Sequence, residues 1–236
     1  MDRNGVRVAL VTGAGGNLGA AVVRLLAERG WRIVAMERTE AALARVADGL
    51  DPERILAEPG VDLGDPEACA GLVRRAVDRF GRVDGLVHTV GGFATAEVAE
   101  GDLAHWERLL QANLFTALNV CRAVVPAMRA AGRGSIVTVG AAGAARAGKG
   151  MAAYASAKSA VLRLTEALAA ELKDAGVRAN CVLPGTIDTP PNRAAMPKAD
   201  TSRWVTPLQI AEVIAFLLSE ASDGVTGAAI PVTGRG

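Results

Sequence analysis

Short apolar runs recur along the 236-residue chain, separated by longer stretches with a helical pattern. The runs are rich in Val and Ile and mostly lack polar alternation, which is typical of strands covered on both faces. Five of them predict strands, at residues 6–12, 31–36, 83–90, 134–140 and 177–183. A weaker strand is expected around Ile55–Leu56, and a last one at 228–234.

The stretches between these runs predict helices near residues 18–29, 40–48, 66–79, 103–130 and 152–175. Strand and helix repeated along one chain indicate a parallel sheet joined by right-handed crossovers. The expected fold class is therefore α/β, a doubly wound parallel sheet of the Rossmann type, with about seven strands and helices on both faces.

No linker, low-complexity block or internal repeat divides the sequence, so residues 1–236 are expected to form a single domain. One segment, near 186–205, is too rich in Pro and polar residues for a regular element. Ligands of open α/β sheets bind outside the carboxyl ends of the strands. Since the segment should lie there, it is expected to be a lid-like insertion over the site.

Composition narrows the function classes. Apolar residues make up 50% of the chain, enough for a large core without disulfides or metals. A net charge of +1 and an aromatic content of 3% argue against a nucleic-acid partner. Cys69, Cys121 and Cys181 fit no metal-ligand spacing, so free buried thiols and no metal are expected. With no signal peptide and no apolar stretch of ~20 residues, the expectation is a cytoplasmic protein without a membrane partner.

A glycine-rich turn joins the first predicted strand to the first predicted helix. Glycines allow backbone N–H groups to approach a pyrophosphate closely, and the helix N-terminus favours negative charge. A glycine cluster alone is a weak signal in a chain with 27 glycines, but its place at a strand-to-helix junction favours a dinucleotide. The predicted cofactor contacts here are Gly13, Gly15, Gly16, Asn17, Leu18 and Gly19.

Glu37 ends the second strand, where a carboxylate can bind the adenosine ribose hydroxyls. The adjacent Arg38 could instead meet a 2′-phosphate, which Glu37 would repel. The pair therefore favours NAD(H) and leaves NADP(H) open. Asp62, beside Leu63, is a candidate partner for the adenine amino group, and a helix cap for the run that begins at Asp65 is the alternative.

Tyr154 and Lys158 are four residues apart on a predicted helix and so share one face. A nearby ammonium favours the phenolate, so Lys158 is expected to lower the pKa of Tyr154 and prepare it for proton transfer. The alternative is an ordinary surface pair. Thirteen residues before the tyrosine, where a catalytic hydroxyl might be expected, the sequence has Ala141.

These features together resemble the short-chain dehydrogenase/reductase family over nearly the whole chain. The matching segments are "TGAGGNLG", "VDGLVHTVGG", Asn113 in "LLQANLFTAL", "YASAK", "VRANCVLPGTIDT" and "VTGAAIPVTGRG". The chain departs from the family at Asn17, a usual glycine. It also departs at 88–91, where His-Thr-Val-Gly replaces Asn-Asn-Ala-Gly, and at Ala141, the position of the family's catalytic serine.

The resemblance implies roles for individual residues. Tyr154 would deliver a proton, Lys158 would hold the nicotinamide ribose, and Asn113 would brace a water that relays protons to Lys158. Further cofactor contacts implied by the resemblance are Val90, Gly91, Gly92, Pro184, Gly185, Ile187 and Thr189.

Within the family, the dihydropteridine reductase branch is similar in its widely spaced glycine turn, its Gly-Gly-aromatic at 91–93 and its missing serine. The stretch 182–204, "VLPGTIDTPPNRAAMPKADTSRW", resembles the lid of that branch. This resemblance implies a reductase of a flat activated acceptor such as quinonoid dihydropterin, a small-molecule substrate. Phe93, Ala141 and Trp204 are its candidate substrate contacts.

Two other functions remain open. One is a general carbonyl or alcohol oxidoreductase whose missing hydroxyl comes from Thr138 or from the substrate. The other is a non-catalytic dinucleotide-binding sensor, against which Tyr154, Lys158 and Asn113 all argue. The helix that carries Tyr154 is small or apolar on more than one face, so a second copy could cover it. The expected partner is therefore another copy of the chain, in a homodimer or homotetramer.

Overall fold

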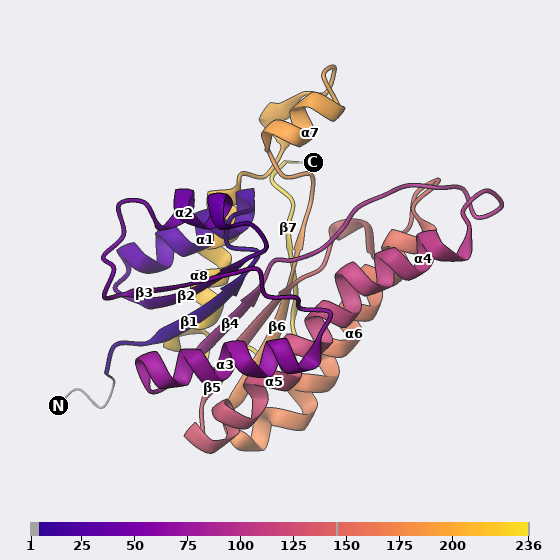
Figure 1. Ribbon diagram of the computed structural model, residues 1–236. Helices are drawn as coiled ribbons and strands as arrows, with labels where there is room; N and C mark the ends of the chain where they lie inside the picture. Colours follow the sequence, from indigo (N-terminus) through magenta and orange to yellow (C-terminus); the bar gives the residue numbers. More distant parts are fainter. Residues whose placement is uncertain (1–4, 145, 236) are drawn as a thin grey trace.

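The computed structural model describes residues 5–144 and 146–235. Seven parallel strands form one sheet in the order β3-β2-β1-β4-β5-β6-β7 (Figure 1). The doubly wound parallel sheet expected from the sequence is therefore confirmed. The strands are β1 (Val8–Thr12), β2 (Arg32–Glu37), β3 (Ile55–Pro59), β4 (Gly85–His88), β5 (Gly134–Val139), β6 (Val177–Pro184) and β7 (Ala229–Val232).

Helices cover both faces of the sheet. One buried cluster joins the sheet to α1 (Asn17–Glu28), α2 (Glu40–Ala47) and α8 (Pro207–Leu218). The other joins it to α3 (Pro66–Phe80), α5 (Thr116–Ala131) and α6 (Ala152–Leu172). The central strands are buried from end to end, as β1 shows, because both of their faces pack against helices.

The expected helix at 103–130 contains an irregular turn. Helix α4 (Leu103–Leu110) continues into a π-helical turn, η1 (Gln111–Phe115), and then into α5. The run Leu103–Ala131 is long and apolar enough to cross a membrane by length and composition, with a mean hydropathy of 1.2. Val120, Val124 and Met128 are nevertheless buried in the core. Core helices of soluble proteins share this length and composition.

Two helices were not expected from the sequence. In α8 a capping box defines the start, because the Thr206 hydroxyl accepts from the Gln209 amide and the Gln209 side chain accepts from the Thr206 amide. In the 186–205 segment, expected to hold no regular element, α7 (Pro190–Ala195) follows Thr189 as its N-cap. Pro190 and Pro191 fit there because the first helical positions need no amide donor.

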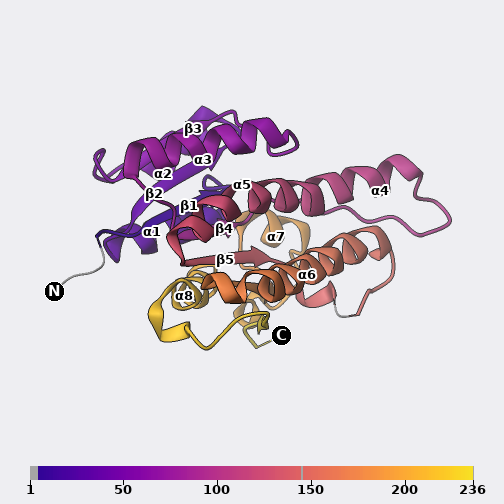
Figure 2. The same cartoon turned by 90° about the horizontal axis from the view of Figure 1, so that it is seen from below.

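The 186–205 segment lies beyond the carboxyl end of β6, and Figure 1 shows α7 above the strand ends, near the C-terminus. A bridge between Ile187 and Val205 closes the base of the segment. Figure 2 shows α4 extending past the sheet beside the start of α6. Because α6 contacts α4, part of the surface expected to need a second copy is covered within the chain. Self-association through α6 stays a prediction.

Candidate active site

The backbone of the glycine turn after β1 packs closely against its neighbours, at positions where only glycine fits. Gly13 has a φ of +70°, and a Cβ there would lie 2.8 Å from Thr89 Oγ1. A Cβ at Gly19 would lie 2.0 Å from the Gly13 carbonyl oxygen, so only glycine allows α1 to start this close to the turn. Gly16 is the N-cap of α1 and provides no side-chain cap. The first amides of α1 therefore suit a pyrophosphate.

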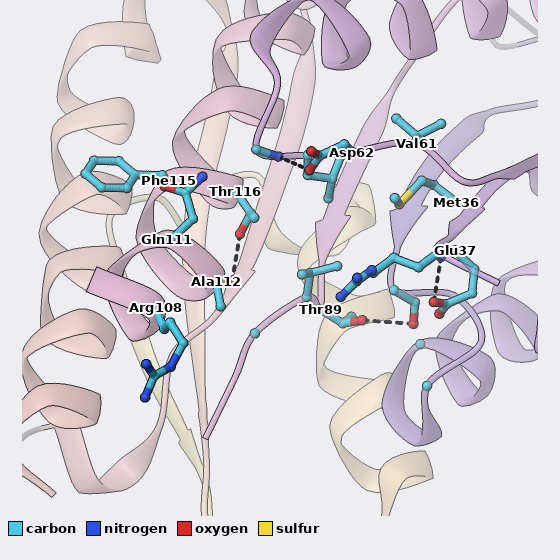
Figure 3. Close-up of a pocket in the computed structure, with 18 of the residues that line it drawn as sticks. Met36, Glu37, Val61, Asp62, Thr89, Arg108, Gln111, Ala112, Phe115 and Thr116 are labelled. Atoms are coloured by element: carbon cyan, nitrogen blue, oxygen red, sulfur yellow. Dashed lines mark hydrogen bonds between the residues drawn. The ribbon is translucent and has the colours of Figure 1, made fainter. Parts of the chain in front are cut away.

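A cleft of about 1260 Å³ runs from this turn across the sheet ends. Figure 3 shows labelled residues on its two sides, Met36, Glu37, Val61, Asp62 and Thr89 facing the α4–η1 side. Its lining includes eleven of the predicted cofactor contacts, of which nine come from the first three strand ends: Gly13, Gly16, Asn17, Leu18, Gly19, Glu37, Arg38, Asp62 and Leu63. The other two, Val90 and Gly91, follow β4. The cleft thus fits the adenosine and pyrophosphate end of a dinucleotide.

Glu37 is fixed against the glycine turn. Its Oε2 accepts a hydrogen bond from the Gly15 amide at 3.0 Å, and its Oε1 accepts one from the Arg38 amide at 2.7 Å. A Cβ at Gly15 would lie 2.9 Å from Glu37 Cγ, so Gly15 supports the carboxylate and does not line the cleft. The fixed negative charge suits ribose hydroxyls better than a phosphate.

Asp62 does not cap α3. Its Oδ1 accepts from the Gly64 amide at 2.8 Å, while the cap of α3 is Asp65, which accepts from the Glu67 amide. The alternative reading of Asp62 as that cap is therefore wrong. The exposed Asp62 carboxylate lies in the cleft, where it can meet an adenine amino group.

Two residues of the predicted proton relay, Asn113 and Lys158, come together around Gly91. A Cβ on this residue would lie 2.6 Å from Asn113 Oδ1 and 3.0 Å from Lys158 Nζ. Asn113 donates to the carbonyls of Gly92 (3.0 Å) and Leu109 (2.9 Å) and accepts from the Gly92 amide (3.2 Å). The absence of a side chain at Gly91 thus leaves the gap between the amide of η1 and the ammonium of α6.

Lys158 is buried, and its Nζ donates to the Val139 carbonyl at 2.8 Å. Burial lowers the pKa of Lys158 to about 8, so the amine is still mostly protonated at pH 7. The pKa of Tyr154 is raised by burial. The expected lowering by Lys158 is not found, because desolvation of the phenol dominates in this structure. A phenol that keeps its proton at neutral pH is suited to act as a proton donor.

Ala141 is buried next to the carboxyl end of β5 and brings no hydroxyl. Thr138 cannot replace it. The Thr165 hydroxyl donates to the Val161 carbonyl at 2.8 Å, so Thr138 donates to Thr165, at 2.7 Å, inside the core. Phe93 does lie at the site, with its ring 5.0 Å from that of Tyr154, edge-on at 81°. Phe93 is 65% exposed, so its ring is available to a substrate.

The loop after β6 brings the remaining predicted residues together. Pro184 is the last residue of β6, and Gly185 packs against Thr233, 3.1 Å from the position of a Cβ. Ile187 pairs with Val205, and Thr189 caps α7. Trp204 is half-buried at the base of the segment, where its backbone packs against Gly234. Its role as a substrate contact stays a prediction.

Several residues of the site were not indicated by the sequence. Thr89 lines the cleft and donates to the Thr12 carbonyl at 2.8 Å. From η1 and its flanks, Arg108, Gln111 and Phe115 line the opposite side. The departure of residues 88–91 from the family pattern could have pointed to Thr89 as a residue of the site. No signal in the sequence pointed to Arg108, Gln111 and Phe115, which are exposed residues of a segment predicted as an uninterrupted helix. Cys69, Cys121 and Cys181 are free and buried, as expected.

His88 is buried at the end of β4, and burial, with the nearby charge of Lys158, lowers its pKa to about 3. The folded protein therefore holds a neutral imidazole at any pH from 7 down to about 4.

Comparisons with known proteins agree with this geometry. A family model described as short chain dehydrogenase matches residues 7–200. The chain is 36% identical to cis-4-hydroxycyclohexanecarboxylate dehydrogenase of Sinomonas cyclohexanicum, over 97% of this chain and 95% of that protein. It is 32% identical to 3-oxoacyl-[acyl-carrier-protein] reductase of Thermotoga maritima, over 97% and 96%. The structure of NAD⁺-bound xylitol dehydrogenase superposes with a TM-score of 0.88 at 28% identity, over 97% of this chain and 98% of that one.

The lowered pKa of His88 predicts that acid destabilises the fold. Unfolded chains take up a proton at a histidine below pH ~6.5, whereas folded His88 does not until about pH 3, so stability falls as pH drops through this window. Between pH 7.5 and 5, the free energy of unfolding should lose about 2 kcal/mol through this group. Urea unfolding of the wild type and His88→Gln at both pH values measures the difference. Equal losses in the two proteins would contradict the prediction.

Gly91→Ala should disrupt the relay, since the added methyl would overlap Asn113 Oδ1 and press on Lys158 Nζ. A displacement of about 1 Å can lower kcat by about 100-fold. Gly92→Ala is the matched control, because its nearest neighbour would be the Ala112 methyl at 3.2 Å. Turnover of a common acceptor should fall far more in the first variant than in the second. Equal activity in both would mean that the relay does not need this gap.

Proposed function

Since the chain belongs to the short chain dehydrogenase family, we propose that it is an NAD(H)-dependent reductase of a flat activated acceptor such as a quinonoid dihydropterin. The family makes it an oxidoreductase that uses a nicotinamide dinucleotide, so the sensor hypothesis is not carried further. The dinucleotide supplies the hydride when bound. The observation that carries the proposal is the buried Ala141 beside a Thr138 that is committed to the core.

Without these hydroxyls, Tyr154 is the donor that the site offers to the acceptor. Removing one donor to a developing oxyanion can cost ~2.7–4 kcal/mol of transition-state stabilisation, a large loss for an enzyme that reduces simple ketones. A quinonoid acceptor tolerates the loss. Hydride addition restores a more stable conjugated ring, and the developing charge spreads over several heteroatoms. The raised pKa of Tyr154 keeps its proton available for transfer.

Phe93 supports a flat substrate. Its ring is exposed and meets Tyr154 edge-on, so a planar molecule stacked on Phe93 would lie beside the Tyr154 ring. Residues 140–144 are all glycine or alanine, so the wall at Ala141 is made of small residues. The resemblance of the 182–204 segment to the lid of the dihydropteridine reductases supports the same acceptor class.

A second candidate is an oxidoreductase of ordinary alcohols or ketones. It is favoured by the relatives, whose names describe a hydroxycyclohexanecarboxylate dehydrogenase and a 3-oxoacyl reductase. In this case the substrate itself would have to supply the hydrogen bond that Ala141 cannot make.

Glu37 supports a preference for NAD(H). We predict that NADH exceeds NADPH in kcat/KM by about tenfold or more, because Glu37 would repel the 2′-phosphate of NADPH. Two like unit charges 4 Å apart near a protein surface repel each other by ~4 kcal/mol before screening by salt. Glu37→Ala and Glu37→Gln should both reduce the preference, and the glutamine separates the effect of charge from that of shape. Initial rates with each cofactor measure it. A wild type that works better with NADPH would show that Arg38 dominates.

The acceptor class can be tested with Ala141→Ser. We predict that the wild type reduces a quinonoid dihydropterin far faster than any simple ketone, and that the new serine hardly changes the quinonoid rate. A panel that also contains cyclic ketones and a 3-oxoacyl thioester covers the second candidate. Steady-state rates for both proteins on the panel are the measurement.

Tyr154→Phe is the control for that panel. It removes the proton donor and should lower every reduction by roughly 10²–10⁴-fold while NADH affinity stays nearly intact. Wild-type preference for ketones, or a serine variant that gains orders of magnitude on the quinonoid, would overturn the proposed acceptor and leave the second candidate.

A further inference from the structure

His88 connects two parts of the site that are far apart in sequence. Thr12, at the end of β1, lies 2.9 Å from His88 Nδ1 through its hydroxyl oxygen. Thr116, at the start of α5, lies 3.3 Å from His88 Nε2 through its own. All three residues are buried. One imidazole thus joins the strand that leads into the glycine turn to the helix segment that carries Asn113.

The π-helical turn fixes the direction of these hydrogen bonds. The Thr116 amide donates to the Gln111 carbonyl, one residue beyond the Ala112 carbonyl that a regular α-helix would use. The Thr116 hydroxyl donates to the Ala112 carbonyl instead, at 2.9 Å. Its proton is therefore committed, and toward His88 the Thr116 oxygen can only accept. Nε2 must then carry the proton, and Nδ1 accepts from the Thr12 hydroxyl.

The same turn positions the relay amide. Asn113 lies within η1, between Ala112 and Thr116. Its Oδ1 accepts a hydrogen bond from the Gly92 amide, and its Nδ2 donates one to the Gly92 carbonyl. Gly92 follows His88 by four residues on the loop after β4. The His88–Thr116 and Gly92–Asn113 contacts therefore connect β4 and the loop after it to the start of α5 and to η1. A shift of η1 would move Asn113 Oδ1 relative to Lys158 Nζ across the gap at Gly91.

We propose that His88 is a positioning residue for hydride-transfer chemistry: as the neutral Nε2–H tautomer it holds Thr116 and η1 against β1, and so sets the place of Asn113 opposite Lys158. The inference rests on the proton relay of the proposed function, but not on its acceptor. A protonated ring would bring a second positive charge near the buried ammonium of Lys158, so the neutral tautomer suits the site in charge as well as in geometry.

The tautomer can be read directly, without turnover. The chain has two histidines, so long-range ¹H–¹⁵N spectra of ¹⁵N-labelled protein contain two ring systems, and His88→Gln assigns them. We expect the His88 ring to show a protonated Nε2 and a bare Nδ1 that do not change between pH 7.5 and 5. A ring that titrates in this range, or that populates the Nδ1–H form, would overturn the proposal.

Thr116→Val and Thr116→Ser test the positioning. The valine keeps the shape but removes the hydroxyl that bridges Ala112 and His88, whereas the serine keeps it. We expect kcat to fall by about 10- to 100-fold in the valine variant, with NADH Kd by fluorescence within about threefold of wild type, and to be largely restored in the serine variant. Ser135→Ala is the control. It removes another buried hydroxyl, hydrogen-bonded to the Leu217 carbonyl at 2.8 Å, from the other end of the sheet.

Activity in this experiment is measured with whichever acceptor the wild type reduces, so failure of the quinonoid assignment leaves the test intact. Thermal unfolding of each variant separates lost folding from lost positioning. A Thr116→Val protein that is folded, binds NADH and keeps wild-type kcat would overturn the inference. So would a kcat loss that the serine does not restore, or one that Ser135→Ala reproduces at equal loss of stability.

Discussion

A buried ammonium group without an acidic partner is the constraint on which the site depends. Lys158 is 6% exposed and makes no ion pair within the described residues, and its Nζ donates to the Val139 carbonyl. Burying an amine costs free energy unless its protons are bonded, and the lowered pKa of Lys158 reflects this cost. Its surroundings fit such a group: a carbonyl at the end of β5, a glycine at 91 that leaves space, and an uncharged imidazole at 88.

The two sides of the site differ in how many polar groups they offer to a ligand. On the dinucleotide side, fixed backbone amides and the Glu37 carboxylate are arranged around a wide cleft. On the acceptor side, the exposed Phe93 ring lies against the phenol ring of Tyr154, and Ala141 brings no hydroxyl. These polar groups are therefore concentrated on the dinucleotide side, and the proposed acceptor side offers mainly small and apolar surface. Such a site selects its acceptor by shape and intrinsic reactivity more than by hydrogen bonds.

Much of the fold could be predicted from the sequence because the strands are buried on both faces and the glycine turn, Glu37, Tyr154 and Lys158 lie at characteristic spacings. Helix α8 was missed because it is apolar on nearly every side, which hides its period. The π-helical turn, and the Thr116 hydroxyl that joins Ala112 to His88, could not be predicted from the sequence. Both depend on which backbone carbonyl accepts from the Thr116 amide in the packed structure. The predicted direction of the Tyr154 pKa shift was wrong for a related reason. Burial raises this pKa, and the burial of a side chain is set by its tertiary neighbours and not by sequence spacing.

The π-helical turn also acts as a change of phase in a long helix. One extra residue in a turn rotates everything before it by roughly 100° about the helix axis, relative to an uninterrupted α-helix. That rotation determines which residues of α4 line the cleft. Arg108 of α4 and Gln111 at the start of η1 line the cleft, while Leu109 and His105 of α4 are buried. Loss of a single residue from η1 would turn these side chains of α4 away from the cleft. The lining of the cleft therefore depends on the length of this helix as well as on its composition.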